Sequence, residues 1–515
     1  LYPNLITQKF SIGLTVENRP IYAVKISDNP NVNESEPQVH MNALIHAREP
    51  QAMMTIMYYM YYLLENYSTD PAIQYLVNNR ELFFIPVVNP DGYEYNRITN
   101  PTGGGRCRKN RKNNGGSFGV DLNRNYGPYA YWNSPNGGSS TSPSSDTYRG
   151  TAPFSEPETI NIKNFLATRN FKNALNYHTY SNLLVYPYGA LSNETPDSLI
   201  FREYAMDMTE FNNYTYGTDM QTVGYSTRGN SDDYFYDGDT VLNSGKIIAM
   251  TPEVGSTGFW PTQAEIFPLA IENLYPNLYY AWVAGEYVKV VDQNINQQYF
   301  NPGDNVQMNP VLINKGLATG YNISLELTSL NDYATVTNSI ASFVSIPSRE
   351  TALVTTPLSL NVSSSAPVEA NIKLLLTTKT NGVVMTYDTI SLIVGTPTFV
   401  FADSTNNPLT LWTISGTPAA APKWSSTINS YNSAPNSYTD SPSGNYSSSS
   451  TITMTLTNPI NLAEITNPHL TFYTKFDIEN GWDYGQVEVS TNNGSTWIPL
   501  QGQYTNSGSG SFQPA

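Results

Sequence analysis

The chain has 515 residues, a length that exceeds one hydrophobic core and predicts about three domains. Its composition, 39% hydrophobic and 13% charged, is typical of folded globular protein and excludes a largely disordered chain. The net charge of −16 disfavours a nucleic-acid partner, because phosphate binding needs clustered Lys and Arg, and the one basic cluster, residues 106–112, is short. The single cysteine, Cys107, excludes an intrachain disulfide.

Neither a membrane span nor a signal peptide is expected from the sequence. The longest apolar stretch, Ala52–Leu64, is too short and too rich in Tyr to cross a bilayer, and it predicts a buried helix. Leu1 begins in mid-pattern, so we interpret the chain as a mature or trimmed form. The cysteine count does not decide the compartment. The prediction of a secreted, extracellular protein depends on the Ser/Thr/Asn/Gly-rich C-terminal region.

Within the first 288 residues, β-type segments alternate with helix-type segments, which predicts an α/β domain with a mixed central sheet flanked by helices. Pro276 is expected to kink the last helix, because proline lacks the backbone N–H that an interior position needs. In chain order the expected elements are a hairpin of Ile12–Val16 and Ile21–Ile26, a strand at Val39–Ile45, a helix at Glu49–Asn66, a strand at Leu82–Val88, a helix from Ser155 to about Thr168, strands at Ala174–Tyr177 and Ile247–Met250, and a helix at Ala264–Val288.

The pattern changes after Val288, where helical periodicity ends and short alternating strands recur. We predict an immunoglobulin-like β-sandwich over residues 289–395. A second β-sandwich or jelly-roll-like module is predicted over residues 396–515 and is expected to be cut short. The expected fold is therefore multidomain. The two β modules are candidates for docking on a cell surface, on glycans or on a larger substrate, or for aiding folding and secretion. Asp403 and Asp483 are candidate ligands for structural Ca²⁺.

The strongest local signal for chemistry is His46-Ala47-Arg48-Glu49, where a predicted strand gives way to a helix. A histidine and a carboxylate three positions apart can face one point, which suits a Zn²⁺ ion. The alternative is an ordinary strand end followed by a charged helix start. His40 is the rival ligand, because strand alternation directs it to the same side as His46.

A catalytic zinc needs a third protein ligand and an open position for water, and His178 is the candidate ligand. It directly follows the predicted buried strand Ala174–Tyr177, and the carboxyl ends of strands are where α/β sheets place functional groups. A lone histidine at this position is more often structural. Its combination with His46 and Glu49 favours a metal site.

These residues belong to a series of motifs that resembles, in the same order, the zinc metallocarboxypeptidases of the carboxypeptidase A and B type over about residues 5–288. The resemblance gives no information about later residues. The matching segments are His46-Ala-Arg-Glu49, Asn89-Pro-Asp-Gly92, Arg108-Lys-Asn-Arg111, Gly119-Val-Asp-Leu-Asn-Arg-Asn125, His178-Thr-Tyr-Ser-Asn-Leu-Leu-Val-Tyr-Pro-Tyr-Gly189, Tyr225 through Tyr236, and Thr251-Pro-Glu253.

The resemblance implies a carboxypeptidase-like fold and an exopeptidase that hydrolyses the C-terminal bond of peptides or proteins. It implies one Zn²⁺ held by His46, Glu49 and His178, and a zinc-bound water that Glu253 activates as the general base. It assigns Arg108 to the scissile carbonyl, where a fixed cation stabilises the developing oxyanion. Arg111, in the same segment, is interpreted as part of a solvated basic loop.

An enzyme that acts at C-termini must also hold a free carboxylate, and arginine suits this role because its guanidinium grips a carboxylate with two parallel hydrogen bonds. Tyr225 follows a glycine in a polar loop, as a lid residue would. The resemblance assigns the substrate contacts to Asn123, Arg124 and Tyr225 for the carboxylate, and to Arg48 and Tyr180 for the preceding residues.

The specificity pocket is expected to include Thr227, Asp232, Asp233 and Thr251. In the family an aspartate at the position of Asp232 resembles the B-type enzymes, which remove Lys and Arg, and a buried carboxylate needs a partner such as a substrate cation. The competing interpretation is that Arg228 pairs with Asp232 and neutralises the pocket. We therefore predict basic or mixed specificity.

Two other functions fit part of the pattern. A peptidase that cuts bacterial cell-wall peptides at diaminopimelate would use the same clamp of Asn123 and Arg124, because its substrate also ends in a free carboxylate. A non-catalytic peptide-binding protein on the same scaffold is the second alternative. Such a protein would typically lack a zinc ligand or the general base. This chain has all three candidate zinc ligands and the candidate base, Glu253.

Overall fold

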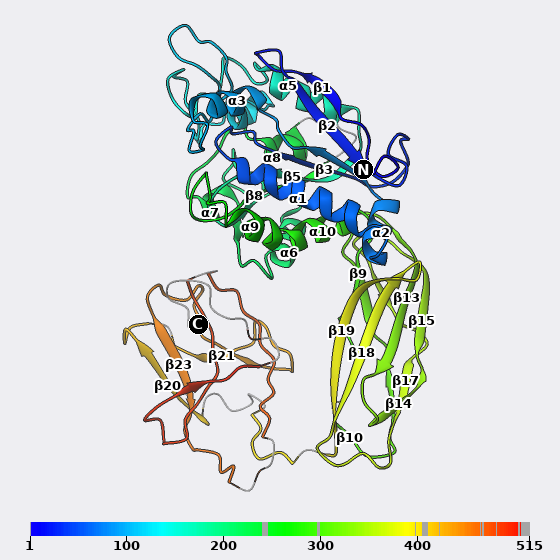
Figure 1. Cartoon of the computed structure of the whole chain (residues 1–515). Helices are drawn as coiled ribbons and strands as arrows, with labels where there is room; N and C mark the ends of the chain where they lie inside the picture. Colours follow the sequence, from blue (N-terminus) through cyan, green and yellow to red (C-terminus); the bar gives the residue numbers. More distant parts are fainter. Residues whose placement is uncertain are drawn as a thin grey trace. The chain divides into compact units, whose positions relative to one another are not determined.

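The computed structural model describes most of the chain as two compact units (Figure 1). The first unit comprises residues 1–297, 305–363 and 372–391, and the second comprises the remaining segments. The described residues are 2–238, 246–295, 299–396, 398–403, 410–421, 423–463, 465, 468–479, 482–502 and 505.

The first unit is built around an eight-stranded sheet with the order β1-β2-β4-β3-β5-β8-β6-β7. Strands β4, β3, β5 and β8 run parallel to one another, β1 and β2 pair antiparallel to their neighbours, and β6 is antiparallel to β8 but parallel to β7, so the sheet is mixed as predicted. Its strands are β1 (Phe10–Leu14), β2 (Pro20–Ile26), β3 (Gln38–Ala43), β4 (Glu81–Ile85), β5 (Phe171–Tyr177), β6 (Leu183–Val185), β7 (Thr215–Gly217) and β8 (Ile248–Glu253).

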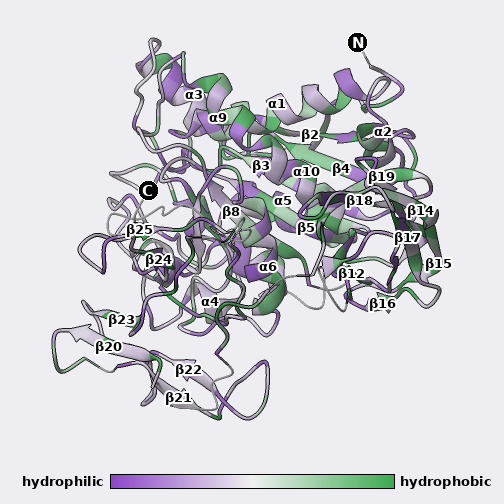
Figure 2. Ribbon diagram, turned by 90° about the horizontal axis from the view of Figure 1, so that it is seen from below, coloured by the Kyte–Doolittle hydropathy of each residue, from purple (hydrophilic) through white to green (hydrophobic). Residues whose placement is uncertain are grey.

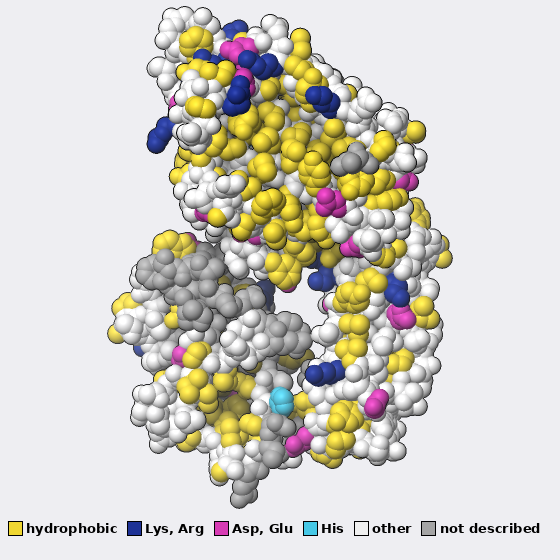
Figure 3. Space-filling view, viewed as in Figure 1, with side chains coloured by type: hydrophobic (Ala, Val, Ile, Leu, Met, Phe, Trp, Pro, Cys, Tyr) yellow, Lys and Arg dark blue, Asp and Glu magenta, His cyan; other side chains and the backbone are white. Residues whose placement is uncertain are grey.

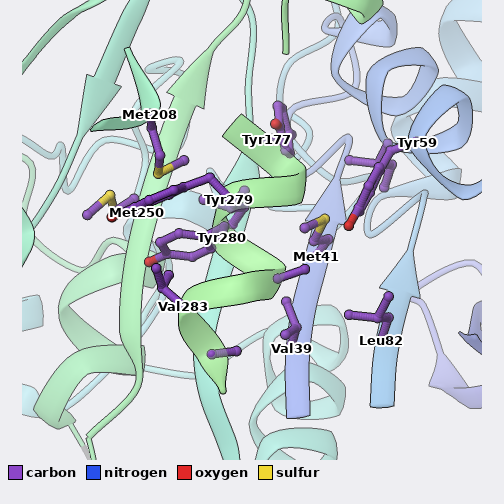
Figure 4. Close-up of a cluster of buried hydrophobic side chains, with 14 of the residues drawn as sticks. Val39, Met41, Tyr59, Leu82, Tyr177, Met208, Met250, Tyr279, Tyr280 and Val283 are labelled. Carbon is purple, nitrogen blue, oxygen red and sulfur yellow. The ribbon is translucent and has the colours of Figure 1, made fainter. Parts of the chain in front are cut away.

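Helices cover both faces of this sheet, and each face has its own apolar core. The larger core joins the sheet to α1, α2, α6 and α10, and the smaller one joins it to α5. Figure 4 shows the larger core, where Tyr279, Tyr280 and Val283 of α10 pack beside Val39 and Met41 of β3. The longer helices are α1 (Pro50–Asn66), α2 (Pro71–Asn78), α3 (Pro90–Thr99), α5 (Pro157–Ala167), α6 (Ser198–Met208), α9 (Ile266–Glu272) and α10 (Leu274–Ala284), and the short ones are α4 (Tyr129–Trp132), α7 (Asp219–Thr222) and α8 (Ser231–Asp233).

The prediction of one helix over Ala264–Val288, kinked at Pro276, is wrong in its continuity, because two separate helices occupy this segment. They meet at Asn273, whose side-chain amide donates to the carbonyl of Leu269. The break precedes Pro276, since a proline ring clashes with the carbonyl four residues earlier. Pro276 therefore lies in the first turn of α10, where a missing N–H costs nothing.

The region after residue 290 contains only strands among the described residues, as predicted. In the first unit these form three sheets, with the orders β15-β13-β18-β19, β11-β17-β14 and β16-β12-β9. The second unit contains the small antiparallel pairs β20–β23, β21–β22 and β24–β25, and the domain boundaries at 288 and 395 stay predictions. The main strands are β9 (Val288–Asp292), β11 (Asn305–Met308), β12 (Val311–Asn314), β13 (Gly320–Ser329), β14 (Ala334–Asn338), β15 (Ile340–Ile346), β16 (Thr351–Leu353), β17 (Leu358–Val362), β18 (Asn371–Thr380), β19 (Val383–Val394), β20 (Trp412–Thr417), β21 (Ser425–Thr427), β22 (Ser437–Thr439), β23 (Thr451–Leu456), β24 (Glu488–Val489) and β25 (Ile498–Pro499).

The middle of the sheet of the first unit is coloured hydrophobic in Figure 2. Hydrophobic side chains also gather on the face drawn in Figure 3. Exposed hydrophobic side chains of the first unit include Tyr61 of α1 and Phe267 and Ile271 of α9, all more than half exposed. Within the described parts of the chain, none of the helices has both the length and the apolar character needed to cross a bilayer.

The all-β region of the first unit is attached to the α/β part through polar contacts with α6. Lys315 bridges the carboxylates of Asp207 and Glu203 at 2.6 and 3.4 Å, and Arg349 pairs with Glu203 at 2.6 Å. The hydroxyl of Tyr204 donates to the carbonyl of Lys315. These contacts lock one face of α6 against the loop that follows β12.

A buried ion pair lies at the same junction. The Arg80 guanidinium is 1% exposed, donates to three backbone carbonyls and pairs with Glu286 at 3.2 Å. The other oxygen of Glu286 accepts hydrogen bonds from Tyr75 in α2 and from Thr380 in β18. Since both charges are removed from water, each depends on the other for compensation.

We therefore expect Glu286→Gln to destabilise the protein by about 3 kcal/mol, because it leaves the Arg80 charge buried and uncompensated. The matched control is Glu194→Gln, which removes the partner of the half-exposed Arg202 and is expected to cost less than about 1 kcal/mol. Urea unfolding of both variants measures the difference. Equal losses for the two variants would show that the junction does not contribute in this way.

Candidate metal centre and substrate cavity

The predicted site residues meet at one edge of the central sheet. His46 lies shortly after β3, His178 directly follows β5, and Glu253 is the last residue of β8. Because β3, β5 and β8 are parallel, their carboxyl ends lie at the same edge, where α/β sheets place ligands. The topology thus brings together groups that are more than 200 residues apart in the sequence.

His46, Glu49 and His178 form one buried cluster, at most 3% exposed. Nδ1 of His46 lies 2.9 Å from Oε1 of Glu49, and Nδ1 of His178 lies 2.8 Å from Oε2. The ligand atoms of all three lie within 4.8 Å of one another. Two imidazoles and one carboxylate are the donor set of a catalytic zinc with an open coordination position, so these residues fit the predicted ion.

The electrostatics of the cluster favour a negatively charged Glu49. Burial opposes its ionisation, but the charges and hydrogen bonds of His46 and His178 outweigh burial and hold the pKa of Glu49 well below its ordinary range. An ionised carboxylate is the form that ligates a metal.

Backbone geometry explains why the segment after β3 turns into the site. Leu44 adopts a positive φ of 55°, which ends the strand before His46, and Pro50 starts α1 directly after Glu49. The intervening turn is held at Ala47, whose carbonyl accepts from the Asn96 side chain and whose N–H donates to the carbonyl of Arg108. The turn therefore has little freedom to move its two ligands apart.

Asp121 is a functional residue that the sequence reasoning did not assign. Its Oδ1 lies 3.1 Å from Nε2 of His46, so it orients this imidazole with Nδ1 toward Glu49. Its Oδ2 accepts from Nε and Nη2 of Arg108 at 3.1 and 3.0 Å. Burial opposes its ionisation, but Arg108 and His46 hold the pKa of Asp121 well below its ordinary range. The signal in the sequence that could have identified Asp121 is its position two residues before Asn123, inside the motif Gly119–Asn125.

The strand alternation that made His40 a rival ligand does not extend to His46, because the positive φ of Leu44 interrupts it. His40 is fully buried, packs against three phenylalanine rings with centroids 5.2–5.8 Å away, and contacts Asn42 through Nε2. Burial lowers the pKa of His40 to about 3. His40 is therefore a core residue and no part of the metal centre.

A cavity of about 680 Å³ opens beside the cluster and contains four arginine side chains. Such a concentration of positive charge in a chain of net charge −16 marks a place for an anion. The cavity is lined by Arg48, Arg108, Arg124, Arg228, Tyr225, Asp146, Thr147 and residues 138–141.

Arg124 is the most buried of these arginines and is only 5% exposed. Its Nε donates to the carbonyl of Gly138 at 2.7 Å and its Nη1 to the carbonyl of Asn123. Within the described part of the chain, Nη2 has no hydrogen-bond partner. Gly138 has a positive φ of 84°, and a Cβ there would lie 1.7 Å from the carbonyl oxygen of Ser226, so only glycine lets this carbonyl reach Arg124.

The other predicted substrate contacts lie around the same cavity. Tyr225 is 55% exposed and follows Gly224, which has a positive φ. Arg48 stacks over the ring of Phe259, 4.1 Å from its centroid, and Tyr180 packs edge-on against the same ring. Phe259 was not predicted, and it links Arg48 to Tyr180.

Glu253 lies at the mouth of a second, smaller cavity of about 100 Å³. Burial, with the Glu49 charge, raises the pKa of Glu253 to about 8, and His178 and Arg108 act against this rise. A divalent cation at the cluster adds positive charge and favours the carboxylate form. The residues that line this smaller cavity include Asn123, Arg124, Tyr225, Thr227, Asp219, Asp232, Asp233 and Thr251.

Two predicted pocket acids have different surroundings. Oδ1 of Asp232 accepts from the Asn176 amide and Oδ2 from the Thr251 hydroxyl, both at 2.6 Å. The oxygens of Asp233 accept the backbone N–H groups of residues 189 and 190. Burial raises the pKa of Asp232 to about 6 and that of Asp233 to about 8.

The alternative partner of Asp232 is excluded, since Arg228 donates to the carbonyl of Ser134 and to the carbonyl and hydroxyl of Ser139. Arg111, expected in a solvated loop, instead lies over two aromatic rings, 3.8 and 4.6 Å from their centroids. Neither arginine pairs with a pocket carboxylate in the described structure.

The candidate calcium ligands are engaged by protein donors. Asp403 accepts from the Trp412 indole and the Tyr438 hydroxyl, and Asp483 accepts from the Tyr446 hydroxyl. In the described part of the chain, neither belongs to a group of three metal-ligating side chains. Calcium binding by the β modules stays a prediction.

Comparison with known proteins agrees with this site. The family model of the zinc carboxypeptidases, peptidase M14, matches residues 1–276. Carboxypeptidase A4 of Mus musculus is 33% identical over 286 residues, which cover 53% of this chain and 63% of that protein. Carboxypeptidase A2 of Mus musculus is 35% identical over 243 residues, which cover 46% and 55%. A solved structure, bovine thrombin-activatable fibrinolysis inhibitor in complex with tick carboxypeptidase inhibitor, is 28% identical with a TM-score of 0.46, and the match covers 55% of this chain and 91% of that one.

The fold and the buried cluster define an α/β metalloprotein with a single-cation site of two histidines and one glutamate. The family model matches more than half of the 515 residues, so the chain belongs to the zinc carboxypeptidase family, peptidase M14, and His46, Glu49 and His178 are its zinc site. The alignments span 55–63% of the length of the two mouse relatives.

We expect the purified protein to bind one Zn²⁺, and Asp121→Asn to weaken this binding about 10- to 100-fold, because an amide orients His46 less well than a carboxylate. Competition with a chromogenic chelator measures the affinity. His469→Ala, which removes a histidine outside the cluster, should leave it unchanged. An Asp121→Asn protein with the original zinc affinity would contradict the role of Asp121.

Proposed function

We propose that this protein hydrolyses the C-terminal peptide bond of peptides or proteins as a metallocarboxypeptidase. The observation that carries the proposal is the placement of a zinc triad, a held arginine and a carboxylate around two cavities that share Arg108, Arg124 and Tyr225. The triad and the carboxylate suit hydrolysis of an amide. The arginine suits selection of a chain end.

Arg124 is the proposed anchor for the terminal carboxylate of the substrate. Its Nε and Nη1 are fixed by backbone carbonyls, so Nη2 points a preorganised donor at the cavity. Asn123 is held through its Oδ1, which accepts the N–H of Ser231, and its amide nitrogen, 3.5 Å from Nε2 of His178, is proposed to donate to the same carboxylate. Tyr225, exposed on its loop, is proposed to close over the bound carboxylate.

A zinc ion at the triad supplies a Lewis acid that lowers the pKa of a bound water and polarises a carbonyl. Glu253 is proposed to take a proton from the attacking water and deliver it to the leaving amine nitrogen. Arg108 keeps its Nε and Nη2 on Asp121, which leaves Nη1 to donate to the carbonyl oxygen as negative charge develops there.

We propose basic or mixed specificity for the departing residue, because the smaller cavity ends in buried acidic side chains, including Asp232, and no described arginine or lysine neutralises Asp232. Arg48, Phe259 and Tyr180 are proposed to contact the residues that precede the scissile bond.

Secretion and docking of the β modules on a cell surface or glycans also stay proposals. Lys315 and Arg349 of the first β module contact α6, and Thr380 contacts Glu286, which follows α10. These contacts support a structural role for this module, in which it stabilises the α/β part. Among the described residues, the second unit provides no comparable contact network to interpret.

We expect Glu253→Gln to keep its zinc and to lose about 10³-fold or more of kcat, because an amide cannot accept the proton from water. Metal analysis and turnover of one peptide, measured on the same preparation, test both parts. Turnover close to that of the unmodified protein would remove Glu253 as the base, and loss of zinc would show a different role.

A panel of blocked dipeptides that end in Lys, Arg, Phe, Leu or Glu tests the reaction and its specificity together. We expect release of the last residue that is strongest for Lys or Arg and that stops when a chelator removes the metal. A cell-wall peptide that ends in diaminopimelate serves as the comparison substrate. Preferential cleavage of that peptide would support the cell-wall alternative, and binding without release would support a non-catalytic protein.

A further inference from the structure

The smaller cavity contains three carboxylates, from Asp219, Asp232 and Asp233, which are 7%, 6% and 0% exposed. Asp219 is the first residue of α7 and was not among the residues predicted from the sequence. The same cavity is lined by Arg124 and Glu253, so it opens where the clamp and the base lie. A side chain next to the scissile bond can therefore enter it.

The three acids differ in how many of their oxygens already have partners. Both oxygens of Asp232 accept side-chain hydrogen bonds, and both oxygens of Asp233 accept backbone N–H groups. Asp219 accepts through Oδ2 alone, and among the described residues no donor reaches its Oδ1. A nearly buried carboxylate oxygen without a partner is costly unless a ligand supplies a donor.

Neighbouring residues hold Asp219 in this position. The Thr227 hydroxyl donates to Oδ2, and the amide of Asn230 donates to the same hydroxyl oxygen at 3.0 Å, so the only proton of Thr227 is directed to Asp219. Gly189 leaves room for the carboxylate, since a Cβ there would lie 2.1 Å from Oδ2. The open oxygen is thus preorganised by its surroundings.

We propose that Asp219 binds the cationic group of a C-terminal Lys or Arg side chain, and that Asp219, more than Asp232, determines this preference. The inference rests on the proposed exopeptidase function. Asp232, with both oxygens engaged, contributes negative charge to the cavity, whereas Asp219 provides the direct acceptor.

An organic cation suits this site better than a second metal ion. Among the described residues, these three acids do not form a group whose ligand atoms lie within 4.8 Å of one another, as the zinc ligands do. Burial raises the pKa of Asp219 to about 6, and the Asp232 charge adds to the rise. A cation in the cavity offsets this cost for all three carboxylates.

The test compares Asp219→Asn with Asp232→Asn, using blocked dipeptides that differ only in a C-terminal Lys or Leu. We expect Asp219→Asn to lower the Lys-to-Leu ratio of kcat/KM about 100-fold, and Asp232→Asn to lower it less. Thr227→Val, which removes the orienting hydrogen bond without changing charge, should lower it about 10-fold. Asp332→Asn, on the exposed surface of the β-sandwich, is the matched control.

Binding of free lysine and free leucine, measured by calorimetry on the same zinc-loaded proteins, provides a readout that needs no turnover. Preferential lysine binding that Asp219→Asn removes would support the inference even if the proposed reaction failed. The inference is overturned if Asp219→Asn changes the Lys and Leu values equally, or if Asp232→Asn has the larger effect, while the proposed hydrolysis stands.

Discussion

The zinc site depends on one buried carboxylate that two imidazoles share. Glu49 lies between Nδ1 of His46 and Nδ1 of His178, and this arrangement brings three ligand atoms within 4.8 Å of one another. His46 cannot turn away, because Asp121 holds its second nitrogen. Asp121 in turn holds Arg108, so the metal ligands and the proposed oxyanion donor are positioned by the same group.

The sequence predicted this cluster because its residues follow strand ends, and parallel strands bring their carboxyl ends to one edge. The spacing of His46 and Glu49, together with the position of His178 after a buried strand, was sufficient to predict the three metal ligands. His40 was ranked as a rival because alternation was extended through Leu44, whose backbone conformation no pattern of hydrophobicity reveals. The predicted single C-terminal helix failed for a related reason, since Asn273 ends α9 before the proline.

The residues that sequence reasoning missed act through tertiary contacts. Asp121 lies inside the motif Gly119–Asn125, but its contacts with His46 and Arg108 appear only in the folded chain, and Phe259 has no local pattern that marks its contact with Arg48. Asp219 lies before Tyr225–Tyr236, the segment that resembles the family. It lies in the smaller cavity because it begins α7 and because Gly189 leaves room for its carboxylate. The sequence can thus predict catalytic and metal-binding residues that stand in one local motif. It cannot predict which of several buried acids has an oxygen without a hydrogen-bond partner, because that depends on tertiary contacts.

The junction of Arg80, Glu286 and Thr380 has a consequence for biosynthesis. Glu286 and its partner Thr380 are 94 residues apart, so the strand that completes the junction leaves the ribosome well after the α/β part has been made. Until then Arg80 and Glu286 lack the cover of β18, and the nascent α/β part is exposed to proteases and chaperones in an unfinished form. We therefore expect synthesis of the strands up to β18 to complete the fold of the α/β part during translation.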